Sequence, residues 1–211
     1  MKNQVEKFSL KSNDLLPLIA AASALRWMNI LKELILKAKS RKIHFTKIYE
    51  TLLQNYLFTG FPSALNSLKI LKDCYPKKII PKVTDMNLYH FKQIGEEHCK
   101  RVYGNKFKKL IKNIKNFSPE LADWLVLEGY GKVLGRKGLS FKERELCIVA
   151  VLTVLNFEDQ LYSHISGAIK AKASIKEVET VIKNLDHLSS KILSRSGIKV
   201  SNKYKKDKLI L

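Results

Sequence analysis

The stretch from Glu145 to Val178, "ELCIVAVLTVLNFEDQLYSHISGAIKAKASIKEV", decides the fold of this 211-residue chain. It holds a run of apolar residues, a short polar break, a second segment that ends in Ala168-x-x-x-Lys172, and a third segment. The third segment begins at Ser174 with Glu177 three residues on, which is the capping-box pattern of a helix N-terminus. The stretch therefore predicts three consecutive helices.

The same pattern occurs 130 positions earlier in the chain. "LLPLIAAASALRWMNILKELILKAKSRKIHFTKI", residues 15–48, aligns with residues 145–178 without a gap, so that Ala38 meets Ala168. A small residue at that position would let two helices approach closely. Matched patterns at a fixed offset are the signature of an internal repeat. We therefore expect two similar helical halves in one chain.

Helix signals dominate the rest of the sequence as well. Ser140 with Glu143 forms another capping box, and Ser118 followed by Pro119 is an N-cap with proline at the first helical position. Only "KKIIPKV", residues 77–83, could be extended, and its proline favours a connection. The sequence predicts an all-α fold.

The apolar run that starts at Leu15 is nearly long enough to cross a bilayer. Polar and charged residues interrupt it at Arg26, Asn29, Lys32 and Glu33, and each is costly in hydrocarbon. We expect a buried helix pair or one long core helix, no membrane partner, and no signal peptide in the polar N-terminal segment.

Three cysteines, Cys74, Cys99 and Cys147, are an odd number at wide and irregular spacing. This argues against a disulfide framework and against a structural zinc site. A reducing compartment fits such cysteine usage, and we expect a cytoplasmic protein.

Charge is the most prominent bulk property, since 39 Lys and Arg against 19 Asp and Glu give a formal net charge of +20. An excess of this size is typical of proteins that bind nucleic acids or anionic surfaces. However, only six of the cations are arginine, the residue that binds phosphate and bases with two hydrogen bonds. The richness in Ile, Asn and Phe also fits a low-GC codon bias, so we do not expect a dedicated nucleic-acid-binding protein.

The two halves differ at two positions that bear on function. Leu15 aligns with Glu145, and Leu34 aligns with His164. The hairpin between the first two helices of the second half should bring this acid and this imidazole together. Glu145 and His164 are therefore candidates for an acid–base pair, although a satisfied buried polar contact would use the same residues.

The second half resembles the carboxymuconolactone decarboxylase and alkylhydroperoxidase-D-like family, through "GYGKVLGRKGL", "RELCIVA", "HISGA" and "ASIKEVETVI". The first half is similar through "IYETLLQNYLFTGFPSALNSL". The resemblance implies an antiparallel all-α bundle of two tandem halves that assembles into a homotrimer or homohexamer. We expect a degenerate half at residues 1–75, a linker with connecting helices at 76–117, a half with the candidate site at 118–190, and a basic tail at 191–211.

One branch of that family uses a Cys-x-x-Cys-x-x-x-His helix for peroxide and disulfide chemistry. Counting back from His164, Phe157 and Gln160 stand where the two cysteines would be, and neither can form a thiolate. A dithiol peroxidase is therefore not expected. A peroxidase activity through a single thiol, Cys147 or Cys99, remains an alternative.

The favoured hypothesis is a cofactor-free lyase, a decarboxylase that acts on a small acidic lactone or keto acid without a metal. Glu145 and His164 would perform acid–base catalysis, Arg136 would hold a substrate carboxylate, and Tyr130 could donate its hydroxyl. The N-terminus of the helix that Ser140 opens would add attraction for an anion. A non-catalytic oligomeric scaffold or binding protein of the same fold is the alternative from another class.

Overall fold

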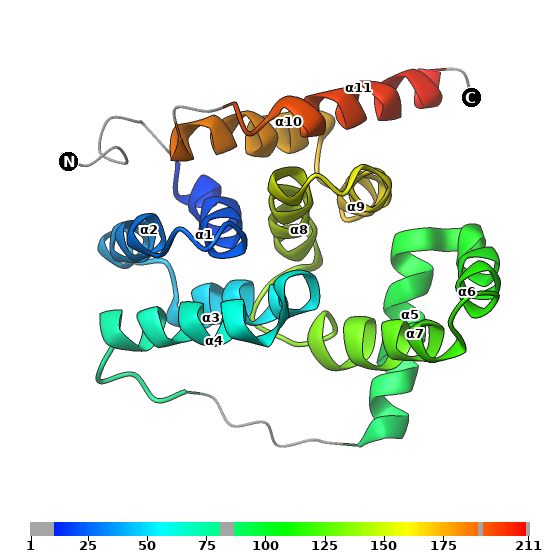
Figure 1. Cartoon of the computed structure of the whole chain (residues 1–211), viewed down its shortest axis with the longest axis horizontal. Helices are drawn as coiled ribbons and strands as arrows, with labels where there is room; N and C mark the ends of the chain where they lie inside the picture. Colours follow the sequence, from blue (N-terminus) through cyan, green and yellow to red (C-terminus); the bar gives the residue numbers. More distant parts are fainter. Residues whose placement is uncertain (1–10, 81–86, 190–191, 210–211) are drawn as a thin grey trace. The chain divides into compact units, whose positions relative to one another are not determined.

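The computed structural model describes residues 11–80, 87–189 and 192–209, and within them the chain is all-α with no strand. The chain forms two compact units, which we describe one at a time (Figure 1). The first unit comprises Met1–Lys78 and Gly138–Leu211, and the second comprises Ile79–Lys137. The expectation of an all-α protein is confirmed.

Two apolar helices form the centre of the first unit. Every residue of α1 (Leu15–Ala24) is buried, and so are most residues of α8 (Phe141–Leu155). The two helices pack side by side, in dark blue and yellow-green in Figure 1. A helix that is apolar on all sides is stable only when neighbours cover it all round, which explains its central place.

The helices on either side of this centre follow the register that the sequence repeat predicts. The hairpin partner of α1 is α2 (Met28–Ser40) and that of α8 is α9 (Glu158–Lys170), followed by α3 (Phe45–Gln54) and α10 (Ile175–Asn184) respectively. The bounds of α2 and α9 differ by 130 positions, as do those of α3 and α10. The predicted helix pair at residues 15–40 is present, rather than one long helix.

The turns between these helices share the same register. Among the described residues, four non-glycine residues have positive φ, and they fall in two pairs at the same offset: Arg26 with Asn156, and Lys42 with Lys172. Each residue ends a helix in a left-handed conformation and reverses the chain. The helix bounds and these turns therefore share one offset between residues 26–54 and 156–184.

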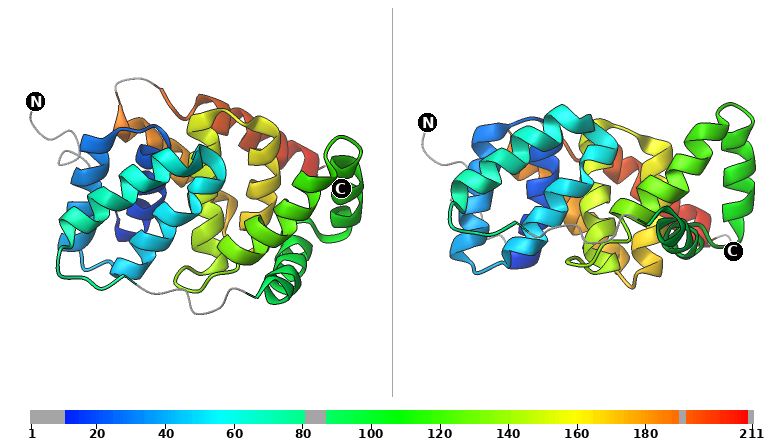
Figure 2. Two further views of the ribbon diagram at one scale, coloured as in Figure 1. Left: turned by 60° about the horizontal axis from the view of Figure 1, so that its bottom comes forward. Right: turned by 90° about the horizontal axis from the view of Figure 1, so that it is seen from below.

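Four further elements complete the first unit: η2 (Ser12–Asp14), α4 (Tyr56–Cys74), η5 (Leu185–Leu188) and α11 (Arg195–Leu209). Helix α4, in cyan and teal, packs on α3 in both views of Figure 2. The chain bends sharply near its start at Gly60, where φ is +75°.

The expectation of a basic tail at residues 191–211 is corrected for the part that the structure describes. Helix α11 packs on α9 and α10 and buries Val200 and Tyr204. A Cβ added to Gly197 would lie 2.7 Å from Ile182 and 2.8 Å from Thr153, so α11 approaches its neighbours closely. The lysines in this segment are spaced around a buried apolar face, which a charge count does not reveal.

The second unit contains α5 (Leu88–Tyr103), η3 (Gly104–Lys106), α6 (Phe107–Lys115), α7 (Pro119–Trp124) and a π-helical segment, η4 (Leu125–Val133). Helix α5 ends at Tyr103, and Gly104 follows it with a positive φ of 58°. Added Cβ atoms at Gly95 and Gly131 would meet the carbonyl oxygens of Val126 and Phe91 at 2.0 Å each. The backbones of α5 and η4 are therefore in direct contact, and only glycine permits this.

These contacts move a predicted domain boundary. We expected residues 76–117 to be a linker and residues 118–190 to be one half, but residues 118–137 cluster with α5 in the second unit. The glycine contacts between α5 and η4 are the physical reason. In the connection at residues 77–83, the structure describes residues 77–80, which have no regular structure, and the remainder lies outside the described residues.

The predicted helix starts are confirmed. Ser140 and Ser174 each accept a hydrogen bond from the backbone N–H three residues on, and the glutamates there accept from the serine N–H groups. Ser118 caps α7, with Pro119 at its first position. None of the helices in residues 11–80, 87–189 and 192–209 combines the length and apolar character of a bilayer-spanning segment.

The positive-φ turns give a stability prediction with a matched pair on one helix. Lys42→Gly, at the left-handed turn after α2, should leave the free energy of unfolding unchanged or raise it by up to about 1 kcal/mol. Lys32→Gly, on the exposed face inside α2, should lower it by about 1 kcal/mol. Urea denaturation measures both, and Lys172→Gly should behave like Lys42→Gly. An equal loss at Lys32 and Lys42 would contradict the assigned turn.

Candidate active site

The first unit brings Glu145 and His164 into direct contact. Glu145 lies in the second turn of α8, and His164 lies midway along α9. The Oε2 atom of Glu145 is 2.8 Å from Nδ1 of His164. Glu145 is 1% exposed and His164 is 6% exposed, so the pair lies almost wholly inside the protein. The contact predicted from the repeat comparison is present; its chemical role stays a hypothesis.

The geometry leaves one edge of the imidazole available. Because a carboxylate can only accept, the hydrogen bond to Glu145 places the ring proton on Nδ1. The Nε2 atom has no hydrogen-bond partner among the described residues. Phe58 meets the ring edge to face, with its centroid 6.4 Å away and the planes at 82°. The imidazole is therefore positioned by two contacts: the hydrogen bond from Nδ1 to Glu145 and the edge-to-face packing of Phe58.

Arg144, next to Glu145 on α8, is a second buried charge that the sequence analysis did not identify. Its guanidinium donates to Glu50 Oε2 at 2.9 Å and to Gln54 Oε1 at 3.1 Å, both on α3. Arg144 and Glu50 are each 2% exposed. Adjacent residues on a helix point in directions about 100° apart. Arg144 and Glu145 therefore contact different neighbouring helices.

The members of this cluster come from both halves of the chain, Arg144 from α8 and the other two from α3. At the offset of 130, Arg144 aligns with Asp14, Glu50 with Thr180, and Gln54 with Asn184. Charged residues thus occur in both halves: Asp14 aligns with Arg144, and Glu50 lies in the first half. Glu50 and Gln54 are also one helical turn apart, so they share a face of α3.

The two proposed substrate-binding residues belong to the second unit. Tyr130 is buried in η4, and its hydroxyl donates to that of Tyr103 at 2.8 Å. This contact engages the hydroxyl that was expected to serve a substrate. Arg136, three residues after η4, is half-buried and is engaged within the protein.

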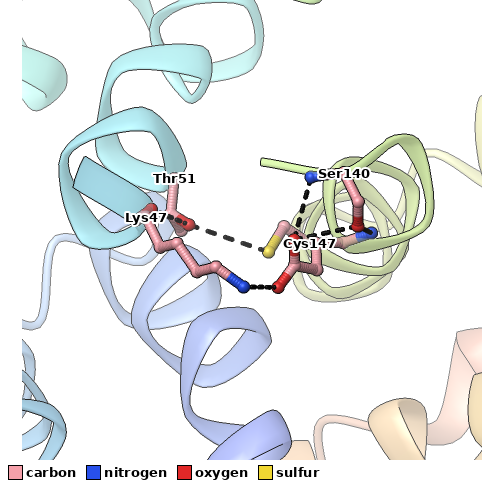
Figure 3. Close-up of polar contacts among 5 residues, drawn as sticks. Lys47, Thr51, Ser140 and Cys147 are labelled. Atoms are coloured by element: carbon pink, nitrogen blue, oxygen red, sulfur yellow. Dashed lines mark hydrogen bonds and ion pairs between the residues drawn. The ribbon is translucent and has the colours of Figure 1, made fainter. Parts of the chain in front are cut away.

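The candidate thiols lie in environments that keep them protonated. Cys147 and Cys99 are fully buried, and burial raises the pKa of each thiol to about 12. The Sγ atom of Cys147 points to the hydroxyl of Thr51 at 4.0 Å (Figure 3). Since the thiolate is the reactive form, neither cysteine is set up for attack on a peroxide.

The N-terminus of α8 is already occupied by a carboxylate of the protein. Glu143 Oε2 accepts from the Ser140 N–H at 2.8 Å, and Glu143 Oε1 pairs with Lys47 (Figure 3). Burial raises the pKa of Glu143, but the hydrogen bonds from Lys47 and Ser140 outweigh it and lower the pKa below its ordinary value. The N-terminus of α8, which we expected to attract a substrate anion, therefore holds the carboxylate of Glu143 instead.

A cavity of about 670 Å³ adjoins that helix end, and its lining includes Arg41, Lys42, Lys47, Lys142, Glu143 and Glu177. Lys47 pairs with Glu143, and Lys142 pairs with Glu177 at 2.5 Å. Glu145 and His164 do not line this cavity. Among the described residues, no group of three His, Cys, Asp or Glu side chains is placed to hold a metal ion.

A comparison with known protein families matches part of the chain that contains the candidate site. Residues 119–187 match the sequence model of the Carboxymuconolactone decarboxylase family. The chain contains a carboxymuconolactone decarboxylase family domain. The matched region includes Tyr130, Arg136, Glu145, Cys147 and His164, whereas Cys99 and the first half lie outside it.

Two yeast proteins are distant relatives of this chain, and both are named Peroxisomal protein 2. The one from Schizosaccharomyces pombe is 26% identical over 138 residues, which is 64% of this chain and 64% of the relative. The one from Saccharomyces cerevisiae is 24% identical over 163 residues, covering 64% of this chain and 58% of the relative. The chain thus spans less than two thirds of the length of either protein.

The buried Arg144–Glu50 pair predicts a large stability effect. Arg144→Met leaves the Glu50 carboxylate buried without its cation, which should lower the free energy of unfolding by about 3–5 kcal/mol. Lys199→Met removes the exposed partner of Glu158 and should cost less than about 1 kcal/mol. Urea denaturation compares the two variants.

A double variant distinguishes two causes of the stability loss: the unpaired buried charge of Glu50 and the lost packing of the Arg144 side chain. Arg144→Met/Glu50→Leu replaces both charges by apolar groups and should recover a large part of the loss. An Arg144→Met protein within 1 kcal/mol of the wild type would show that the pair is not buried as described.

Proposed function

We propose that the protein is a cofactor-free lyase of the carboxymuconolactone decarboxylase family type, which decarboxylates a small acidic lactone or keto acid. The observation that carries this proposal is the 2.8 Å contact between Glu145 Oε2 and His164 Nδ1, two residues that are both buried. A carboxylate that fixes the tautomer of an imidazole is a recurrent arrangement in acid–base catalysis.

In the proposed reaction, the bond between the substrate's carboxylate and its α-carbon breaks, and carbon dioxide leaves. The electron pair of that bond moves toward the adjacent carbonyl and forms an enolate. For this step the Nε2 atom of His164 first takes up a proton from solvent, which makes the ring an imidazolium. The imidazolium then delivers that proton from Nε2 to the α-carbon, while Glu145 stabilises the charged ring through Nδ1. General acid–base assistance of this kind contributes about 10²–10⁴-fold to a rate.

The proposal includes the relation between the two halves of the chain. We infer that residues 1–75 are a diverged copy of the family fold, because their helix bounds and left-handed turns share the register of the second copy. Leu15 and Leu34, both fully buried, occupy the positions of Glu145 and His164. Only the second copy would then be catalytic. Self-assembly into a homotrimer or homohexamer is part of the same proposal.

The substrate-binding roles of Arg136 and Tyr130 stay predictions from the sequence. Both side chains have a partner within the protein, and Tyr103 engages the hydroxyl of Tyr130. The relatives' name makes the peroxisome a competing proposal to the cytoplasm that the cysteine usage favours. Imaging of the fluorescently tagged chain in yeast distinguishes these two compartments.

A non-catalytic scaffold or binding protein is the second candidate function. The observation that favours it is the burial of the Glu145–His164 pair, together with the position of the 670 Å³ cavity, which other residues line. In that case the pair would join α8 to α9 and contribute to stability alone.

Turnover of a panel of γ-lactone carboxylates and β-keto acids separates the two candidates. His164→Gln should lower kcat by about 10²–10⁴-fold, because the proton donor is lost. Glu145→Gln should lower kcat less and shift its pH profile, since the imidazole remains. Arg136→Gln should mainly raise KM.

Glu158→Gln is the matched control, because it removes an exposed carboxylate at the start of the same helix α9. Its rate should equal that of the wild type. If the wild type turns over no member of the panel, or if His164→Gln is as active as the wild type, the catalytic proposal is wrong.

A further inference from the structure

Helix α6 in the second unit is amphipathic yet has no buried residue. Its sequence, Phe107–Lys115, is "FKKLIKNIK", with lysines but no acidic residue. The apolar side chains Phe107, Leu110, Ile111 and Ile114 recur at helical spacing and are only half-buried. An amphipathic helix normally buries such a face against a core. The apolar face of α6 is therefore incompletely covered within its unit.

A cavity of about 690 Å³ lies along this face. Its floor is apolar and comes from three elements: Phe107 and Ile111 of α6, Ala122 of α7, and Val126 and Leu127 of η4. Cavities of this size bind small molecules in many proteins. The lining residues come from α5, α6, α7 and η4, the green elements of the second unit in Figure 1.

The rim of the cavity is cationic. Lys92 on α5 and Lys108, Lys112 and Lys115 on α6 line it, against the acidic residues Glu96 and Asp123. One of these cations is partly neutralised, since Lys115 lies 3.6 Å from Asp123. Lys108 and Lys112 are one helical turn apart and lie on either side of Ile111 in sequence, so two ammonium groups flank the apolar floor.

The η4 segment contributes an unusual wall. It is a nine-residue π-helix, and Val126 and Leu127 face the cavity from its first turn. Such helices are rare and are frequently found at functional sites. The π-helical segment η4 thus borders a cavity that combines an apolar floor with a cationic rim.

We propose that this cavity binds a single-chain amphiphilic carboxylate, such as a medium- or long-chain fatty acid. The hydrocarbon chain would lie on the floor of Phe107, Ile111 and Leu127, and the carboxylate would contact Lys108 and Lys112. Burial of each methylene group contributes about 0.8 kcal/mol, so binding should strengthen with chain length. The proposal is independent of the Glu145–His164 chemistry.

Isothermal titration of the full chain with dodecanoate, below its micelle concentration, tests the site. One molecule should bind per chain, and octanoate should bind more weakly. Dodecanol has the same chain without the charge, and it should bind at least about tenfold more weakly because the ion pairs are lost.

Variants assign the binding to this cavity. Lys108→Glu/Lys112→Glu should weaken dodecanoate binding at least about tenfold. Lys106→Glu/Lys109→Glu is the matched control: it makes the same change of charge at exposed lysines that do not line the cavity, and its affinity should stay within about twofold of the wild type. Ile111→Glu should weaken binding through the floor, and circular dichroism confirms that each variant is folded.

Three results would overturn the proposal. Equal losses in the two double variants would indicate attraction to bulk positive charge alone. Equal affinity for dodecanol would remove the carboxylate from recognition. Binding to phosphatidylglycerol vesicles with no binding of dodecanoate monomers would assign α6 to a lipid surface instead. If Lys108→Glu/Lys112→Glu does not fold, Lys92→Glu on α5 replaces it with the same expected direction.

Discussion

Two buried charges next to each other on α8, Arg144 and Glu145, constrain the structure around the candidate active site. Neither can be inside the protein without an opposite or hydrogen-bonding group, because an unpaired buried charge is strongly unfavourable. Each finds its partner on a different helix: Glu50 on α3 for Arg144, and His164 on α9 for Glu145. These two contacts fix which faces of α3 and α9 turn toward α8, and so they set the register of three helices.

Helix α1, which aligns with part of α8 at the offset of 130 positions, has no buried charge that needs a partner. Helix α1 is buried along its whole length and holds no charged residue, so packing alone positions its neighbours. Helices α2 and α3 have the same bounds as α9 and α10 at an offset of 130 positions, whereas leucines align with Glu145 and His164. The first half also buries polar residues, among them Glu50 and Gln54, and these two accept the hydrogen bonds of Arg144.

Local signals made much of this architecture predictable. Capping boxes at Ser140 and Ser174 gave the helix starts, and the offset between the copies gave the hairpins and the Glu145–His164 contact. The Arg144–Glu50 pair was missed because residues 94 positions apart have no local signal. Helix α11 was taken for a tail because lysines hide its apolar face. The packing of α5 on η4 depends on a glycine contact that no periodicity reveals.

The central claim is that Glu145 holds the imidazole of His164 in one tautomer with Nε2 facing away from the carboxylate. Long-range ¹H–¹⁵N correlation spectra of protein labelled at histidine nitrogens measure this directly, with His164→Gln to assign the signals. The account predicts a proton on Nδ1 of His164. An Nδ1 atom without a proton, beside an Nε2 that carries it, would contradict the account.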